Sequence, residues 1–236
     1  MKAPLPVIAG VAPSRQWLPA GQWETILDFL KERHTGVEAA TWVARMARGQ
    51  VVDETGRRLN PESPYRTGAC IFYYREVETE TPIPFIECVL YQDEHLLVAD
   101  KPHFLPVVPA GRFLQQTLLV RLRNRGKPEQ LVPIHRLDRE TAGVVLFSLN
   151  PATRGDYAAL FQGRRVKKMY EALAPTLPGL SLPLTRRSRV VTGEPFFRMR
   201  EVEGEPNSET HIDVVERMGG VTRYVLSPVT GRKHQL

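Results

Sequence analysis

The chain has 236 residues, of which 42% are hydrophobic and 25% charged. It is therefore long enough for two small domains and too apolar for a disordered protein. The net charge of +6 favours a polyanionic partner without requiring one. No stretch approaches the length of a membrane span, the first residues lack the apolar core of a signal peptide, and the two cysteines form no metal-binding cluster. We therefore expect a cytoplasmic protein that binds neither membrane nor metal.

The N-terminal part of the chain predicts a small α/β module preceded by an irregular segment. Residues 1–20 are punctuated by proline and glycine and predict no regular element. Apolar residues then recur at helical spacing twice and at strand spacing twice. The expected helices cover residues 23–30 and 39–47, and the expected strands cover 51–53 and 69–74. We expect residues 21–75 to form one compact module.

Residues 76–84 are acidic and contain two prolines, which predicts a linker between domains. A second domain then spans residues 85–236 and begins with strands alternating with turns. Its expected elements are strands at 86–91, 96–100, 131–134 and 144–149, and a short helix at 117–123.

The charged stretch His135–Gly143 lies between two apolar runs that both predict buried strands. Polar groups held between core strands are a common arrangement for functional loops. The alternative is a solvated turn with local ion pairs, for example between Arg136 and Glu140. Gly143 can adopt the backbone angles needed to enter the second strand.

Beyond this loop, Asn150 and Pro151 predict the start of a helix. Residues 166–173 predict a strand whose alternation places Lys168 and Tyr170 on one face. Five arginines then form a basic region on poorly defined strands, where they either contact nucleic acid or are simply solvated. These are Arg186, Arg187, Arg189, Arg198 and Arg200. Two further strands are expected at 210–216 and 221–226.

The sequence His135-Arg136-Leu137-Asp138, followed by residues 139–143, closely resembles the active-site motif of the RluA-type pseudouridine synthases. The family usually has serine where this chain has Ala142. Three further matches support the resemblance. They are the run from Asp93 to Pro102, the Lys168-x-Tyr170 pattern, and Gly231–Leu236, in which Lys233 replaces a threonine.

The order of elements in residues 21–75 resembles the S-four-type RNA-binding module that precedes many pseudouridine synthase domains. Arg45 and Arg48 lie off the apolar stripe of the second helix, where they could meet phosphates or form a solvated face.

The resemblance implies an α+β fold: a catalytic domain with a mixed, mostly antiparallel sheet and flanking helices, after a small α/β RNA-binding module. It implies isomerisation of uridine to pseudouridine in structured RNA, either ribosomal or transfer RNA. It implies no cofactor, and we expect a monomer.

The resemblance also assigns roles to individual residues. Asp138 would be the carboxylate that adds to the sugar or assists departure of uracil, and Arg232 would pair with it. Tyr170 would pack against the base or take a proton, although its ordinary pKa of about 10 favours packing. Arg136, Lys168 and Leu236 would bind the substrate, with Arg136 supporting a flipped nucleotide.

Two alternatives stay open. A non-catalytic RNA-binding protein of the same fold would keep the charge but has no need of Asp138, Tyr170 and Arg232 together. A glycosidase-like hydrolase using Asp138 and Glu140 is disfavoured, because residues two apart on a loop rarely give the required carboxylate separation. Family members normally continue beyond the third motif, so we expect a C-terminally truncated catalytic domain in which residues 232–236 are poorly anchored.

Overall fold

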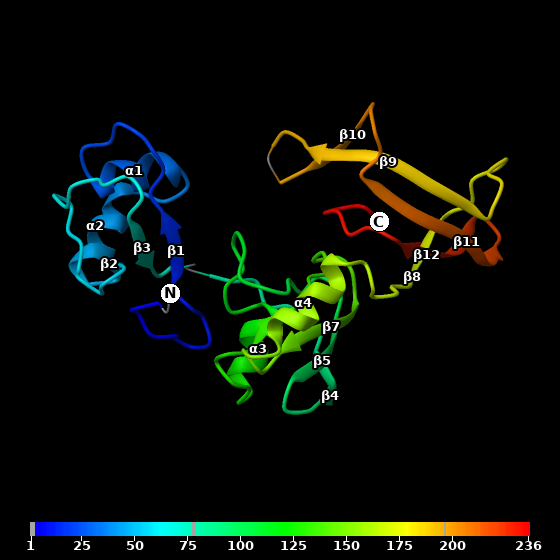
Figure 1. Ribbon diagram of the computed structural model, residues 1–236, viewed down its shortest axis with the longest axis horizontal. Helices are drawn as coiled ribbons and strands as arrows, with labels where there is room; N and C mark the ends of the chain where they lie inside the picture. The colour runs from blue at the N-terminus through cyan, green and yellow to red at the C-terminus, as the bar shows by residue number, and fades with distance from the viewer. Residues whose placement is uncertain (1–2, 77–78, 196) are drawn as a thin grey trace. The chain divides into compact units, whose positions relative to one another are not determined.

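The structure, a computed structural model, describes residues 3–76, 79–195 and 197–236. The described chain contains four helices and three antiparallel sheets, which confirms the predicted α+β class (Figure 1). It divides into two compact units: Met1–Pro133 with Arg139–Leu149, and Ile134–Asp138 with Asn150–Leu236. Within the described residues, no helix is long and apolar enough to cross a membrane, and no group of three acidic, histidine or cysteine side chains could hold a metal.

The first sheet and two helices form the N-terminal part of the first unit. Its elements are β1 (Ser14–Trp17), α1 (Ile26–Arg33), α2 (Ala39–Ala47), β2 (Val51–Asp53) and β3 (Cys70–Tyr73), with strand order β1-β3-β2. Helix α1 begins with a capping box, in which the side chains of Thr25 and Asp28 each accept a hydrogen bond from the other's backbone N–H. Strand β1 lies within the segment predicted to be irregular, because its polar sequence shows no apolar alternation.

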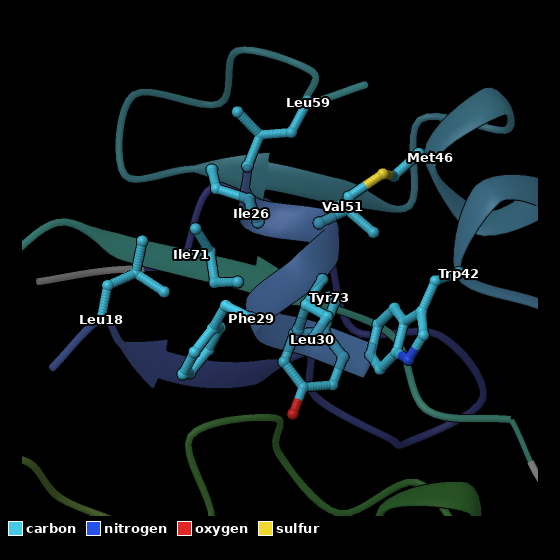
Figure 2. Close-up of a cluster of buried hydrophobic side chains, with 10 residues drawn as sticks. All are labelled: Leu18, Ile26, Phe29, Leu30, Trp42, Met46, Val51, Leu59, Ile71 and Tyr73. Atoms are coloured by element: carbon cyan, nitrogen blue, oxygen red, sulfur yellow. The ribbon is translucent and has the colours of Figure 1, made fainter. Parts of the chain in front are cut away.

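A cluster of ten buried apolar residues fills the space between the two helices and the sheet (Figure 2). They are Leu18, Ile26, Phe29, Leu30, Trp42, Met46, Val51, Leu59, Ile71 and Tyr73. Burial of this kind stabilises a small domain by roughly 1.5–3 kcal/mol for each large side chain.

Arg45 and Arg48, for which the sequence left open phosphate contacts or a solvated face, both form ion pairs within the protein. Arg45 is only 4% exposed, and its guanidinium lies 4.9 Å from the centre of the Trp42 ring. Both Arg45 and Arg48 form ion pairs with Glu76, at 3.5 and 3.0 Å. The expectation that Arg45 is solvent-facing was therefore wrong. A guanidinium can lie over an aromatic ring and still reach an acid outside the helix. Both cysteines are free: Cys70 is buried and Cys88 is exposed.

The second sheet completes the first unit. Its strands are β4 (Cys88–Gln92), β5 (Leu96–Lys101), β6 (Val132–Pro133) and β7 (Gly143–Ser148), in the order β4-β5-β7-β6, and α3 spans Leu118–Asn124. Part of the predicted linker is held near α3: the Glu80 carboxylate accepts hydrogen bonds from the backbone N–H groups of Gln115 and Gln116, at 2.7 and 2.8 Å. Val77 and Glu78 of this linker lie outside the described residues.

The second unit contains α4 (Arg154–Gln162) and a five-stranded sheet. The strands are β8 (Tyr170–Pro175), β9 (Leu184–Thr192), β10 (Met199–Val202), β11 (Ser208–Met218) and β12 (Val221–Pro228), in the order β10-β9-β11-β12-β8. The strand predicted at 166–173 begins only at Tyr170, so Lys168 lies in the preceding loop. Within β8 the predicted alternation holds, because Tyr170 is half-buried and Glu171 exposed.

Candidate active site

The second half of the charged loop is held by two basic side chains near the end of β5. Lys101 is fully buried, and its ammonium donates hydrogen bonds to the carbonyl oxygens of Leu105 at 2.8 Å and of Arg139 at 3.1 Å. The ring of His103 hydrogen-bonds the carbonyl of Glu140 at 2.6 Å. Because Arg139 directly follows Asp138, Lys101 fixes the backbone next to the predicted catalytic carboxylate.

Gly143 ends this loop with φ of 125°, so it supplies the backbone conformation expected of it where β7 begins. The local ion pair in the loop joins Arg139 and Glu140 at 2.6 Å, and not Arg136 and Glu140. The solvated-turn alternative accounts for this ion pair, and it is also compatible with Arg136 and Asp138, both of which are exposed.

The first half of the loop belongs to the second unit. The imidazole of His135 stacks on the ring of Phe161 in α4, with ring centres 4.8 Å apart and planes 20° apart. Burial, together with the charge of Lys168, lowers the pKa of His135. A neutral, stacked His135 thus ties the segment that carries Arg136 and Asp138 to helix α4.

All six residues predicted for the site fall within this second unit: Arg136, Asp138, Lys168, Tyr170, Arg232 and Leu236. Burial raises the pKa of Tyr170, and the negative charge of Asp138 raises it further. The Asp138 carboxylate therefore lies close enough to the phenol to affect its ionisation. The two residues are 32 positions apart in the sequence.

Lys168 is half-buried and does not point freely into solvent. Its ammonium donates a 2.9 Å hydrogen bond to the carbonyl oxygen of Thr230. Burial lowers the pKa of Lys168, and the nearby charge of Arg164 lowers it further. This hydrogen bond thus joins the loop before β8 to the residues that precede Arg232.

The terminal motif is anchored by one amide side chain, so the expectation that residues 232–236 are poorly held was wrong. The Gln235 amide oxygen accepts hydrogen bonds from the Thr230 hydroxyl at 2.8 Å and from the backbone N–H of Arg232 at 2.9 Å. Its amide nitrogen donates to the Glu209 carbonyl at 3.1 Å and to the Thr210 hydroxyl at 2.9 Å. Two of these hydrogen bonds hold the segment on β11, and the other two close the turn within the segment itself.

The pairing predicted between Asp138 and Arg232 is not formed. The guanidinium of Arg232 donates through Nε to the carbonyl of Asn207 at 3.0 Å, and within residues 3–76, 79–195 and 197–236 no ion pair joins it to Asp138. Leu236 is 52% exposed. Sequence reasoning assigned no role to Lys101, His135 or Gln235, although all three lie inside the quoted motifs.

Comparison with known proteins identifies the class. The family model described as RNA pseudouridylate synthase matches residues 95–236, and the chain belongs to this family. Within the family it is of the RluA type. It is 34% identical over 151 residues to the dual-specificity RNA pseudouridine synthase RluA of Escherichia coli K12, covering 63% of this chain and 68% of that protein.

Another relative and a solved structure to which the chain is similar also carry the name of an RNA pseudouridine synthase. The chain is 32% identical over 148 residues to an uncharacterized RNA pseudouridine synthase of Synechocystis, covering 63% of this chain and 50% of that protein. It thus spans about half the length of that relative. Among solved structures, the human RNA pseudouridylate synthase domain containing 1 aligns with a TM-score of 0.54 and 26% identity, over 66% of this chain and 65% of that one. The N-terminal residues up to 94 lie outside the family match.

Proposed function

We propose that this protein is an RNA pseudouridine synthase that isomerises uridine to pseudouridine in structured RNA, either ribosomal or transfer RNA, and that it acts as a cytoplasmic monomer without a cofactor. Family membership supports the reaction type. The observation that carries the proposal for this chain is the influence of the Asp138 carboxylate on Tyr170 within one compact unit. A carboxylate whose charge acts on a tyrosine suits chemistry at the sugar of a nucleoside that packs on that tyrosine.

The reaction breaks the bond between uracil N1 and ribose C1′, turns the base, and forms a bond between C5 and C1′. In our proposal Asp138 either adds to C1′ as uracil leaves or assists that departure, and the proton on C5 is lost at the end. The exposed position of Asp138 lets a nucleotide approach once it has left its stack, which costs a few kcal/mol.

Tyr170 would act as a neutral platform for the base. Burial and the Asp138 charge both raise the pKa of Tyr170, so the phenol keeps its proton at neutral pH. A protonated phenol packs against uracil or donates a hydrogen bond, and it is poorly suited to remove a proton. We therefore favour positioning over base catalysis for this residue.

The four remaining residues would serve the substrate. Arg136, exposed beside the carboxylate, would support the flipped nucleotide. Arg232 would reach Asp138 when RNA is bound, in exchange for its bond to Asn207. Lys168 would shape the pocket by holding Thr230, with Leu236 at its edge. The N-terminal module would add RNA affinity as an S-four-type domain.

A second candidate function has one observation in its favour. In the described residues Arg232 forms no ion pair with Asp138, which fits an RNA-binding protein that keeps the fold but does not turn over. Chemical mapping distinguishes the two functions. Pseudouridines are mapped by carbodiimide labelling in total RNA from cells with and without the gene. The synthase predicts at least one site that disappears without the gene, and identical maps would favour the binding protein.

A further inference from the structure

The loop between α4 and β8 carries the densest positive charge of the second unit. Four of the five residues from Arg164 to Lys168 are basic, and the fifth is Val166. Lys168 is already engaged with Thr230. The other three, Arg164, Arg165 and Lys167, are exposed, and we call them the basic strip.

The charges of the basic strip have no partner in the protein. Within the described ranges, none of its three side chains forms an ion pair within 4 Å or donates a hydrogen bond. Some other arginines of the same unit are neutralised: Arg187 pairs with Glu209 at 3.0 Å, and Arg186 pairs with Glu201. A group of adjacent like charges without an acidic partner lowers stability through mutual repulsion. Burial lowers the pKa of the neighbouring Lys168, and the charge of Arg164 lowers this pKa further.

The backbone conformation at Arg164 is a second, independent indication that this arginine has a role other than ending the helix. Helix α4 ends in a Schellman arrangement, in which the N–H of Arg165 bonds to the Leu160 carbonyl at 2.8 Å and the N–H of Arg164 bonds to the Phe161 carbonyl at 3.2 Å. This arrangement places Arg164 in the left-handed region, with φ of 54°. Glycine is the usual residue there, because a side chain makes the conformation unfavourable. Helix termination therefore does not explain the arginine.

The basic strip lies immediately before the strand that begins with Tyr170. Lys167 and Tyr170 are three residues apart, and Lys168 between them holds the terminal motif. We infer that Arg164, Arg165 and Lys167 bind phosphates of the RNA strand that flanks the target nucleotide. Guanidinium and ammonium groups are the usual phosphate ligands, and phosphate contacts set the position of an RNA without reading its sequence. This inference rests on the proposed function, because it requires RNA as the substrate.

The salt dependence of RNA binding tests the inference. The probe is a stem–loop transcript with uridines in its loop, which suffices because phosphate binding is independent of sequence. The triple variant Arg164→Gln, Arg165→Gln, Lys167→Gln should lower the steepness of log affinity against log salt by about 2, at about 0.7 for each lost contact. At 0.1 M salt this corresponds to roughly 100-fold weaker binding. In turnover, KM should rise while kcat changes little, since the contacts are made equally before and during the reaction.

Arg217→Gln is the matched control. Arg217 is also exposed and forms no ion pair in the described part of the chain, and it lies in the same unit. Arg217 of β11 lies opposite Thr222 of β12, and Thr222 lies opposite Ala174 of β8. Ala174 is four residues from Tyr170 along β8, which is roughly 13 Å at about 3.3 Å per residue. This variant should keep the wild-type salt dependence. If Arg217→Gln lowers RNA affinity as much as the single strip variant Arg164→Gly does, net charge alone explains the effect. That result would overturn the inference.

Arg164→Gly separates binding from folding. Glycine fits the left-handed position, so the Tm should stay the same or rise by up to about 2–4 °C, while RNA affinity falls several-fold. Unchanged affinity would overturn the inference for this residue.

The proposed function is tested separately by tritium release from RNA labelled at uridine C5. If the wild-type protein releases tritium and the strip variants match it in KM and salt dependence, the inference fails and the function stands. If the wild-type protein releases none, the function itself fails.

Discussion

The N-terminal module and the β8–β12 sheet are stabilised in different ways. Ten apolar side chains are buried together between α1, α2 and the first sheet (Figure 2). In the described part of the second unit, three buried side chains are apolar, Val190, Tyr224 and Pro228, and four are hydroxyls: Ser208, Thr210, Thr222 and Thr230. The first region therefore depends on the hydrophobic effect, and the second on strand pairing and polar contacts.

This difference coincides with the division of function. The predicted catalytic and substrate-binding residues all belong to the unit with the polar interior. Hydrogen-bonded hydroxyls such as Thr210 and Thr230 fix the terminal motif through Gln235, a task that apolar side chains cannot perform. Regions with few buried apolar contacts also open more readily, which suits a surface that must admit RNA.

The largest expected effect concerns the apolar core. Phe29 is 1% exposed and packs against Trp23 and Tyr65, so Phe29→Ala should lower the free energy of unfolding of the module by about 3–5 kcal/mol. The chain's three tryptophans are Trp17, Trp23 and Trp42, so tryptophan fluorescence during urea unfolding reports on this module alone.

Val215→Ala is the corresponding change in the β8–β12 sheet, whose unfolding must be followed by circular dichroism because this sheet contains no tryptophan. Val215 is 42% exposed, and its truncation should change stability by less than about 0.5 kcal/mol. Comparable losses in the two variants would contradict the contrast between the two regions.

The second-largest expected effect concerns the hydrogen bonds that hold the terminal motif of the second unit. Gln235→Ala removes four hydrogen bonds and leaves Thr210 and the Glu209 carbonyl without these partners. An unsatisfied buried group costs about 1–3 kcal/mol, so tritium release should slow by roughly 10- to 100-fold while the tryptophan signal of the module is unchanged. His234→Asn is the control, since asparagine tolerates the positive φ of 55° at this position. Equal rates for the two variants would show that the amide does not hold the motif.

The smallest effect is a pH dependence at Tyr170. The pKa of Tyr170 is raised in the folded protein by burial and by Asp138, above the value of about 10 in the unfolded chain. The folded state therefore keeps its proton longer, and the stability due to this group is present below pH 10 and is lost as the pH rises through the folded pKa. Tyr170→Phe should remove this loss and leave the stability at pH 7 within about 1 kcal/mol. An identical decline in both proteins above pH 10 would contradict the shift.

The sequence predicted the elements whose apolar residues follow a clear period. Helix α2 and strands β5 and β7 fall within one residue of their predicted positions, and α1 begins three residues later than predicted. Strands β9 and β10 were only poorly defined, because arginines on both faces of β9 remove the alternation that marks a half-buried strand. Strand β1, with the sequence Ser-Arg-Gln-Trp, lacks the alternation for a similar reason.

For the site, the motifs predicted which residues belong together, but not what holds them. A lysine is rarely fully buried, so nothing in composition marks Lys101 as the side chain that fixes Arg139. The anchoring of Gln235 depends on Thr210 and Glu209, which are 25 and 26 positions away in the chain. Contacts of such sequence separation are a property of the sheet register, which local patterns do not specify.

The most direct test of the central claim is tritium release from RNA labelled at uridine C5, by the wild-type chain and by Asp138→Asn. The substitution keeps the shape of the side chain and removes only its charge, so RNA binding should change little. We predict release by the wild-type protein and none detectable from the variant. Activity of the variant within about tenfold of wild type, which is only about 1.4 kcal/mol in the barrier, would show that Asp138 is not the catalytic carboxylate.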